Sequence, residues 1–362
     1  MRVVRSEEDM EQEYNSATSE AKKAFGIADV FVEKYIERPK HIEVQVLGDK
    51  YGNIVHMFER DCSIQRRHQK VIEFAPSLIL SEEQRQAICE DALKIARHVN
   101  YRIAGTVEFL VDAQGNHYFI EMNPRIQVEH CVTEQITGID IVQAQIRVAQ
   151  GYKLADPEIG IPTQDSITHR GYAIQCRVTT EDPANNFAPD TGKITSYRSP
   201  GGFGIRLDGG NAYTGAEISP YYDSLLVKIT TWGNSFEGAC RKADRAINEV
   251  HVRGVKTNIA FIANILQNPT FRAGKCHTKF IDETPELFQL TESQDRATKM
   301  LKYIANIVVK ERDGHKFYET PRFPPVTGKR PAGLKPLLDR EGPEAVAKWV
   351  LDQKKLLITD TT

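Results

Sequence analysis

The residues from Glu121 to His130 constrain the fold more than any other part of the chain. Met, Pro, Ile and Val occupy the even positions up to 128, and the polar residues occupy the odd positions: Glu121, Asn123, Arg125, Gln127 and Glu129. In an extended chain, successive side chains point to opposite faces. The pattern therefore predicts an extended segment with one apolar face and one face carrying two carboxylates, an arginine and two amides.

A hairpin is predicted immediately before this segment. Residues 105–111 are typical of one strand, 112–116 of a turn, and 118–120 of the start of the next strand. Pairing across that turn puts Glu108 opposite Glu121, or one step from it. Like charges that face each other across a sheet are destabilising, by about 1 kcal/mol in water and several times more in a partly buried site.

A cation shared by the two carboxylates would reverse the sign of this interaction. Oxygen ligands from Glu108, Glu121 and Asn123 suit a hard ion such as Mg²⁺, which commonly keeps substrate phosphates as further ligands. The alternative is an ordinary solvated strand face. The pattern favours a site for a metal and phosphates.

Composition describes an ordinary globular protein with room for about two domains. The chain has 362 residues, a hydrophobic content of 40%, a charged content of 27% and a formal net charge of −2. This charge gives no nucleic-acid signature, and no apolar run approaches the length of a membrane span. No signal peptide is visible, and the six cysteines include no C-x-x-C pair. We therefore expect reduced thiols in a cytoplasmic protein.

Capping residues and periodicity predict the other elements, giving an α+β protein. Helices are expected from Ser6 to Phe25, from Ser81 to Val99, and over residues 133–150 and 236–250. Strands are expected over residues 30–35, 41–47, 54–59 and 172–178. In the last strand, Gln175 and Arg177 share the face opposite to the apolar residues.

A run of hydrogen-bond donors, residues 61–70, follows one of these strands and includes Gln65, His68 and Lys70. Polyphosphate binding needs several donors and positive charge in a small volume. A solvated basic loop is the favoured interpretation when the run is taken alone. A carboxylate pair that binds a metal favours the nucleotide interpretation, because a metal-bound nucleotide needs both features.

Three further charged residues are candidates for the site, and two of them have two interpretations each. Arg125 projects into the predicted metal site and offers a planar fork for a carboxylate or bicarbonate. Glu129 could be a general base or an acid that complements a helix N-terminus. Arg177 could bind a ligand or lie at the edge of the core.

Several motifs in one order resemble the biotin carboxylase family of ATP-grasp enzymes. They are residues 33–36, 41–45, 59–70 and 121–130. The resemblance spans roughly residues 1–285 and implies an ATP-grasp fold with a mostly antiparallel sheet. Residues 333–342 and 356–362 are similar to the entry into the carboxyltransferase barrel of pyruvate carboxylases.

The resemblance implies a role for each matched position. Adenine would be held by Glu33, Lys34 and the backbone near Ile36, and the ribose and phosphates by His41, Gln65 and His68. The ion, Mg²⁺ or Mn²⁺, would be bound by Glu108, Glu121 and Asn123, the two glutamates also counting as ATP contacts. Bicarbonate would be held by Lys70, Arg125, Gln127, Val128 and Glu129. Glu129 would deprotonate it, and Arg125 with Arg177 would stabilise the biotin anion.

The implied activity is ATP- and bicarbonate-dependent carboxylation of biotin through carboxyphosphate, the first half of the route from pyruvate to oxaloacetate. The implied partners are a biotinylated carrier domain and a carboxyltransferase domain, within a homo-oligomer in the complete enzyme. The family places a further subdomain and a glycine-rich loop before the first residue here, and no Ala-Met-Lys-Met biotin acceptor is present. We therefore expect an internal piece that is inactive alone.

Three alternatives remain. The chain could be a non-catalytic truncated module that assembles with the full-length enzyme. It could carry the same half-reaction in an acyl-CoA carboxylase, or it could be a ligase of the carbamoyl-phosphate type. The expected domains are a lid remnant (1–35), an ATP-grasp core (36–155), a C-terminal subdomain (166–285), a linker (286–332) and the start of a carboxyltransferase domain (333–362).

Overall fold

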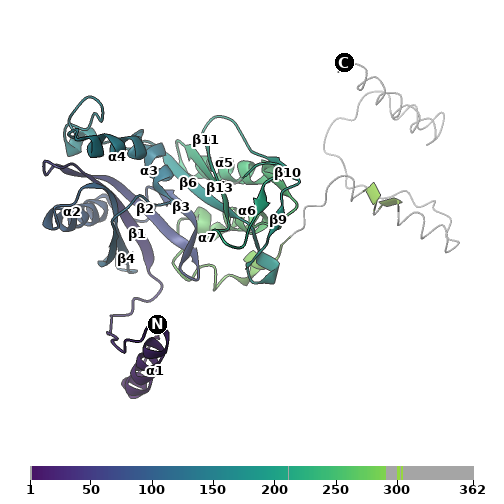
Figure 1. Cartoon of the computed structure of the whole chain (residues 1–362), viewed down its shortest axis with the longest axis horizontal. Coiled ribbons are helices and arrows are strands. Elements are labelled where there is room, and N and C mark those ends of the chain that lie inside the picture. The colour runs from purple at the N-terminus through teal and green to yellow at the C-terminus, as the bar shows by residue number, and fades with distance from the viewer. Residues whose placement is uncertain (1, 211, 291–299, 302, 305–362) are drawn as a thin grey trace. The chain divides into compact units, whose positions relative to one another are not determined.

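The computed structural model describes residues 2–210, 212–290, 300–301 and 303–304. The chain divides into two compact units, Met1–Glu292 and Ser293–Thr362. All the elements named below belong to the first unit (Figure 1). The predicted start of a carboxyltransferase domain (333–362) and most of the predicted linker (286–332) lie outside the described residues.

Within the described residues, the centre of the first unit is an eight-stranded sheet with the order β11-β13-β6-β3-β2-β1-β4-β5 (Figure 1). All its neighbouring strands pair antiparallel. The strands are β1 (Lys40–Gly48), β2 (Ile54–Arg66), β3 (Gln69–Ala75), β4 (Ile103–Val111), β5 (His117–Asn123), β6 (Tyr172–Thr179), β11 (Ile205–Gly209) and β13 (Leu225–Gly233). The predicted α+β class with a mostly antiparallel sheet is confirmed.

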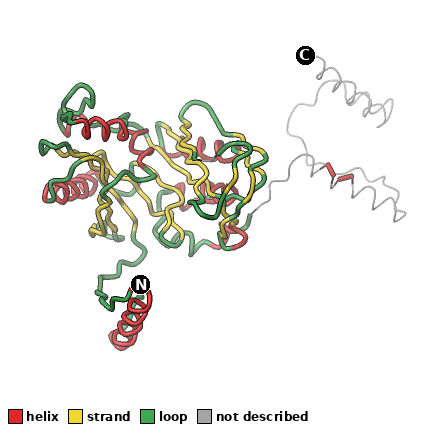
Figure 2. The backbone as a smooth tube through the Cα atoms, viewed as in Figure 1, coloured by secondary structure: helices red, strands yellow, loops and turns green. Residues whose placement is uncertain are grey.

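Short strands form two-stranded ladders beside this sheet: β7 (Glu181–Asp182) with β8 (Ala188–Pro189), β9 (Gly192–Lys193) with β12 (Glu217–Ile218), and β10 (Ser196–Arg198) with β14 (His251–Arg253). The α-helices are α1 (Glu7–Phe25), α2 (Glu82–His98), α3 (His130–Thr137), α4 (Ile141–Gln150), α5 (Phe236–Glu249), α6 (Ile259–Gln267) and α7 (Pro269–Arg272). The 3₁₀ turns are η1 (Gln164–Ser166), η2 (Pro183–Asn185) and η3 (Pro285–Phe288). Figure 2 shows where helices, strands and loops lie along the backbone. Among the described residues, no helix has both the length and the apolar character that a membrane crossing requires.

The predicted caps explain where two helices begin. The Ser6 hydroxyl accepts a hydrogen bond from the Asp9 amide at the start of α1. At the start of α2, Ser81 and Gln84 form a reciprocal capping box. Such caps satisfy amide groups that have no partner in the first helical turn, so the predicted helix starts are confirmed.

Apolar clusters are buried against both faces of the sheet. On β6, Ile174, Cys176 and Val178 are buried in a cluster that includes β3, β13 and helices α5, α6 and α7. A second cluster joins β1 and β4 to α2, and a third joins α4 to the sheet. Full burial of one such aliphatic side chain contributes about 1.5–3 kcal/mol.

A row of polar side chains crosses the sheet between these clusters, and we call it the polar band. Its members face one another across neighbouring strands: Glu43 pairs with Arg60 and Glu108, Gln45 with Thr106, Gln175 with Glu73 and Thr230, and Arg177 with Lys228. Helix α3 packs against β2, β3, β6 and β13 and contributes contacts to this band. The band is therefore buried between the sheet and α3.

Two strand predictions were wrong. Residues 30–35 form no strand, and most of their side chains are exposed, since this segment has no neighbouring strand on which to bury an apolar face. The alternating segment after residue 120 is extended only to Asn123, where β5 ends. Pro124 has no amide hydrogen to continue a ladder, and the chain turns before α3 begins at His130.

Two other boundaries also differ from the prediction. The run 61–70 is not a loop after a strand: it continues β2, turns at Arg67 and His68, and enters β3. The predicted helix 133–150 is two helices, α3 and α4, because Gly138 adopts a left-handed conformation (φ 73°) that ends α3.

Candidate active site

The two predicted metal-binding carboxylates lie directly opposite each other. Glu108 of β4 is the register partner of Glu121 of β5. The Asn123 amide nitrogen lies 3.0 Å from Glu108 Oε1 and 3.0 Å from Glu121 Oε1. A half-turn of this amide would present Oδ1 to the same point. The three side chains thus fit a hard divalent cation that prefers oxygen ligands.

Lys70 lies at the centre of a second group, which we call the ionic cluster: Lys70, Glu43, Glu108 and Glu129. The Lys70 ammonium donates to Glu43 Oε2 at 2.5 Å, to Glu129 Oε1 at 2.6 Å and to Glu108 Oε1 at 3.1 Å. All three carboxylates are buried. One ammonium therefore contacts three buried acids.

The surrounding cations keep two of these acids ionised. Burial alone would raise the pKa of Glu43, but Arg60 and Lys70 outweigh it and hold that pKa at about 2. Burial would likewise raise the pKa of Glu108, but His41 and Lys70 hold it at about 2. His41 Nε2 lies 2.6 Å from Glu108 Oε2.

Arg177 joins Glu129 to the polar band. Its Nε donates to Glu73 Oε1 at 2.5 Å and its Nη2 donates to Glu129 Oε2 at 3.0 Å. Glu73 also accepts from Gln175 Nε2 at 2.9 Å. The Arg177 guanidinium therefore contacts the buried Glu73 on one side and Glu129 of the ionic cluster on the other.

Glu129 and Val128 occupy the turn into α3. Glu129 is the N-cap residue of that helix, but its side chain makes no capping hydrogen bond. Its two oxygens accept from Lys70 and Arg177 instead. The carbonyl of Val128 accepts from Lys228 Nζ at 3.0 Å. This geometry favours the general-base interpretation of Glu129 over that of an acid that complements the helix N-terminus.

The remaining predicted residues differ in how closely they approach this site. Arg125 Nη2 lies 3.3 Å from Asn123 Oδ1, so Arg125 adjoins a predicted metal ligand. Gln65 Nε2 lies 2.7 Å from His41 Nδ1, and His41 in turn contacts Glu108. Lys34 Nζ lies 3.4 Å from the Tyr118 hydroxyl. Ile36 is buried, whereas Glu33 and His68 are exposed and make no contact with the ionic cluster in the part of the chain that the structure describes.

Three residues of the site were not assigned a role from the sequence: Glu43, Arg60 and Glu73. A signal existed for Glu43, which follows His41 by two residues and alternates with apolar neighbours, so both point to one face of β1. No local pattern distinguishes Arg60, because it stands in a run rich in charged residues. Glu73 acquires its partners only through the pairing of β3 with β6.

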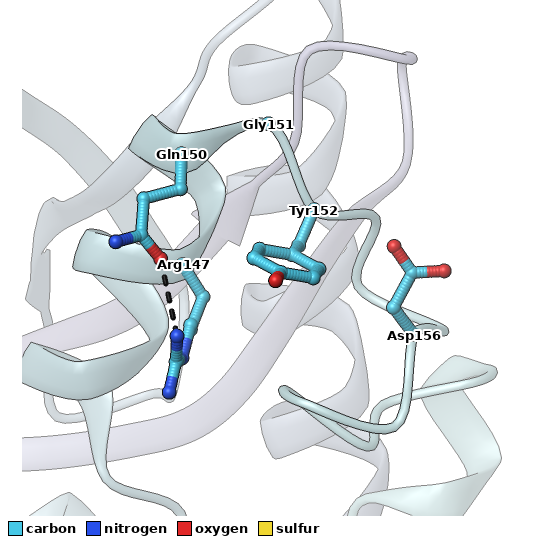
Figure 3. A pocket seen from close by; sticks show the side chains of 5 residues that line it. All are labelled: Arg147, Gln150, Gly151, Tyr152 and Asp156. Carbon is cyan, nitrogen blue, oxygen red and sulfur yellow. Dashed lines mark hydrogen bonds between the residues drawn. The ribbon is translucent and has the colours of Figure 1, made fainter.

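A polar cavity of about 360 Å³ lies at the end of α4 (Figure 3). It is lined by Arg147, Gln150, Gly151, Tyr152 and Asp156. Arg147 donates to Gln150 Oε1 at 3.2 Å, so its guanidinium is partly satisfied within the wall. None of the lining residues belongs to the ionic cluster, and the cavity is separate from the candidate active site.

Comparisons with known proteins show the family to which the chain is similar. Residues 1–157 match the family described as carbamoyl-phosphate synthase L chain, ATP binding domain, and residues 175–283 match the biotin carboxylase C-terminal domain. The chain is 57% identical over 369 residues to pyruvate carboxylase of Bacillus subtilis, covering 100% of this chain and 32% of that protein. The chain belongs to the biotin carboxylase family. It is also 54% identical to human mitochondrial pyruvate carboxylase, covering 100% of this chain and 31% of that protein.

Solved structures of the family show the same fold. The biotin carboxylase domain of a thermophilic 2-oxoglutarate carboxylase bound to bicarbonate gives a TM-score of 0.76 at 49% identity, covering 80% of this chain and 64% of that one. Rhizobium etli pyruvate carboxylase with the allosteric activator acetyl coenzyme-A gives 0.77 at 52% identity, covering 96% and 32%. The predicted ATP-grasp fold is confirmed, and the chain spans about a third of the length of its pyruvate carboxylase relatives.

Proposed function

We propose that this chain carries the biotin carboxylase half-reaction of a pyruvate carboxylase: ATP and bicarbonate are used to carboxylate biotin. The observation that carries the proposal is the position of Glu129. Its carboxylate lies between the Lys70 ammonium and the Arg177 guanidinium, at 2.6 and 3.0 Å. Two cations beside one buried acid form a site in which a small anion can be held and deprotonated.

In this proposal the bicarbonate ligands are those that the resemblance to the biotin carboxylase family implies. Lys70 and Arg125 supply positive charge, and Gln127 and the Val128 amide supply neutral donors. Glu129 would remove the proton, so that the anion can attack the γ-phosphorus of ATP, with ADP as the leaving group and carboxyphosphate as the product. Positioning and charge stabilisation of this kind account for most of the catalysis in phosphoryl transfer.

The metal and the nucleotide would lie beside this anion site. Glu108, Glu121 and Asn123 are the proposed ligands of Mg²⁺ or Mn²⁺, which when bound neutralises charge on the phosphates. His41, Gln65 and His68 would contact the ribose and phosphates, and Glu33, Lys34 and Ile36 the adenine. Arg177, held by Glu73, would then stabilise the biotin anion.

The domain assignments and partners are part of the same proposal. Residues 36–155 would form the ATP-grasp core and 166–285 the C-terminal subdomain, with 1–35 belonging to a lid. A biotinylated carrier domain and a carboxyltransferase domain are the proposed partners, in a homo-oligomer. The cytoplasmic location stays a prediction, since one of the relatives is mitochondrial.

The test is ATP hydrolysis by a full-length enzyme that contains this chain, because the chain alone is expected to be inactive, and the rate is measured with bicarbonate, with free biotin and with ammonia. We expect hydrolysis that requires bicarbonate, rises with biotin and does not respond to ammonia. Glu129→Gln keeps the shape of the side chain but removes the base, so it should lower the rate about a hundredfold or more. The exposed Lys94→Met variant is the control and should match the wild type.

Bicarbonate-independent hydrolysis, or an ammonia-stimulated rate, would contradict the proposal, the latter in favour of a ligase of the carbamoyl-phosphate type. An inactive chain that co-elutes with the full-length enzyme in gel filtration would favour the non-catalytic module.

A further inference from the structure

Arg60 is a fully buried arginine for which every donor has an acceptor. Its side chain is 0% exposed. Its Nε donates to Glu43 Oε1 at 2.5 Å; its Nη1 donates to Gln45 Oε1 at 2.7 Å and Thr133 Oγ1 at 3.1 Å; its Nη2 donates to Thr106 Oγ1 and Gln127 Oε1, both at 3.1 Å. A guanidinium has five N–H groups and no acceptor. This fork is therefore saturated, and its geometry is fixed.

The contact with Gln127 decides which end of that amide faces the proposed anion site. Because Arg60 can only donate, the Gln127 oxygen must face Arg60, and the amide nitrogen must point the other way. The nitrogen lies 2.6 Å from Glu108 Oε1, beside Lys70. With the opposite orientation, the Gln127 nitrogen would face an N–H group of Arg60, two donors with no acceptor between them, at a cost that a buried site magnifies.

The contact with Glu43 acts in the same direction on Lys70. One oxygen of Glu43 accepts from Arg60 and the other accepts from Lys70 at 2.5 Å. Arg60 and Glu43 are both fully buried. The contacts from Arg60 to Glu43 and from Glu43 to Lys70 therefore hold the Lys70 ammonium from the interior of the protein. The ammonium is thereby directed toward Glu129 and Glu108.

We infer that Arg60 is the positioning residue of the bicarbonate site: it turns the donor end of Gln127, and through Glu43 the ammonium of Lys70, toward the anion. This inference rests on the proposed function, since it assumes that the anion is bicarbonate. Arg60 itself is too deeply buried to touch a substrate. Its effect should therefore appear in the affinity for bicarbonate rather than for the nucleotide.

The test compares two variants in the full-length enzyme that contains this chain. Arg60→Lys keeps the charge beside Glu43 but lacks the fork, so it cannot also hold Gln127. We expect the KM for bicarbonate to rise about tenfold or more, the effect of losing one hydrogen bond to an anion, with the KM for ATP changed less than about twofold. Thr106→Val is the matched control: it removes the other acceptor of the same Nη2 and leaves Gln127 in place, so the KM for bicarbonate should stay within about twofold.

A second readout does not depend on turnover. Bicarbonate should raise the melting temperature of the wild type and of Thr106→Val in the presence of MgADP, and should not raise that of Arg60→Lys. A wild type with neither a bicarbonate-dependent rate nor this shift would refute the proposed function. A responsive wild type together with an Arg60→Lys variant of unchanged KM for bicarbonate would overturn the positioning role alone. Equal losses in both variants would also overturn it, because they would show a general disturbance of the polar band.

If Arg60→Lys does not fold, a structure of the wild type tests the inference instead. A crystal structure of the chain with bicarbonate should show the anion within hydrogen-bonding distance of Gln127 Nε2. An anion contacted by the Gln127 oxygen, or bound out of reach of this amide, would overturn the inference.

Discussion

Replacing Lys70 by methionine removes the centre of the ionic cluster, and the structure indicates how large the effect should be. Lys70→Met leaves Glu43, Glu108 and Glu129 buried without the ammonium that all three contact at 2.5–3.1 Å. Breaking a buried ion pair by removing one partner costs about 3–5 kcal/mol. The pKa of Glu43 gives a similar scale: a fall from 4.5 to about 2 corresponds to about 3 kcal/mol, a share of which comes from Arg60.

The loss should depend on pH in a definite direction. In the wild type, the folded pKa values of Glu43 and Glu108 lie near 2, below the ordinary value of about 4.3. Their contribution to stability is therefore complete above about pH 4.3 and is lost as the pH falls toward 2. Without Lys70 these acids become easier to protonate, so the penalty is greatest at neutral pH and is relieved as the pH falls.

Urea denaturation followed by circular dichroism at pH 7.5 and pH 5.0 measures both quantities. We expect Lys70→Met to be less stable by about 3–5 kcal/mol at pH 7.5 and by a smaller amount at pH 5.0. Lys94→Met is the control: Lys94 Nζ contacts Asp91 at 2.8 Å with an exposed side chain, and such pairs contribute about 0.2–1 kcal/mol. A Lys70→Met variant within about 1 kcal/mol of the wild type at pH 7.5, or a penalty that grows on acidification, would refute the reasoning.

Two further variants test the neighbouring groups. Glu121→Gln removes one proposed metal ligand from the exposed end of β5, so it should weaken Mg²⁺-dependent binding of a fluorescent nucleotide about tenfold while leaving the melting temperature nearly unchanged; unaltered Mg²⁺ dependence would contradict the ligand assignment. Glu73→Gln removes the negative charge that Arg177 Nε contacts. This variant should raise the KM for biotin about tenfold and change the KM for bicarbonate little. Equal increases in both constants would show that Glu73 supports the whole site rather than Arg177.

Local chemistry allowed much of the site to be predicted from the sequence. The pairing of Glu108 with Glu121 follows from a short turn between two alternating strands, and the starts of α1 and α2 follow from Ser6 and Ser81. Each of these features depends on residues close together in the chain, where spacing determines which side chains meet.

The parts that could not be predicted depend on distant pairing. Arg177 reaches Glu129 because β6 lies beside β3, and no periodicity in either strand specifies its neighbour. Arg60 is similar: its surroundings come from β1, β4, the turn before α3, and α3 itself. The end of β5 was misjudged because the alternation continues past Pro124, although the backbone can no longer pair there.

The ladder between β3 and β6 has a mechanical consequence. It joins a strand within the ATP-binding match to a strand within the C-terminal match, through rungs such as Ile72 with Cys176. Lys70 lies on β3 and Arg177 on β6, so moving these two residues apart would require breaking main-chain hydrogen bonds in the middle of the sheet. We therefore expect the two halves of the sheet to move as one rigid unit. A biotin group on a carrier domain would then have to fit a site of fixed width.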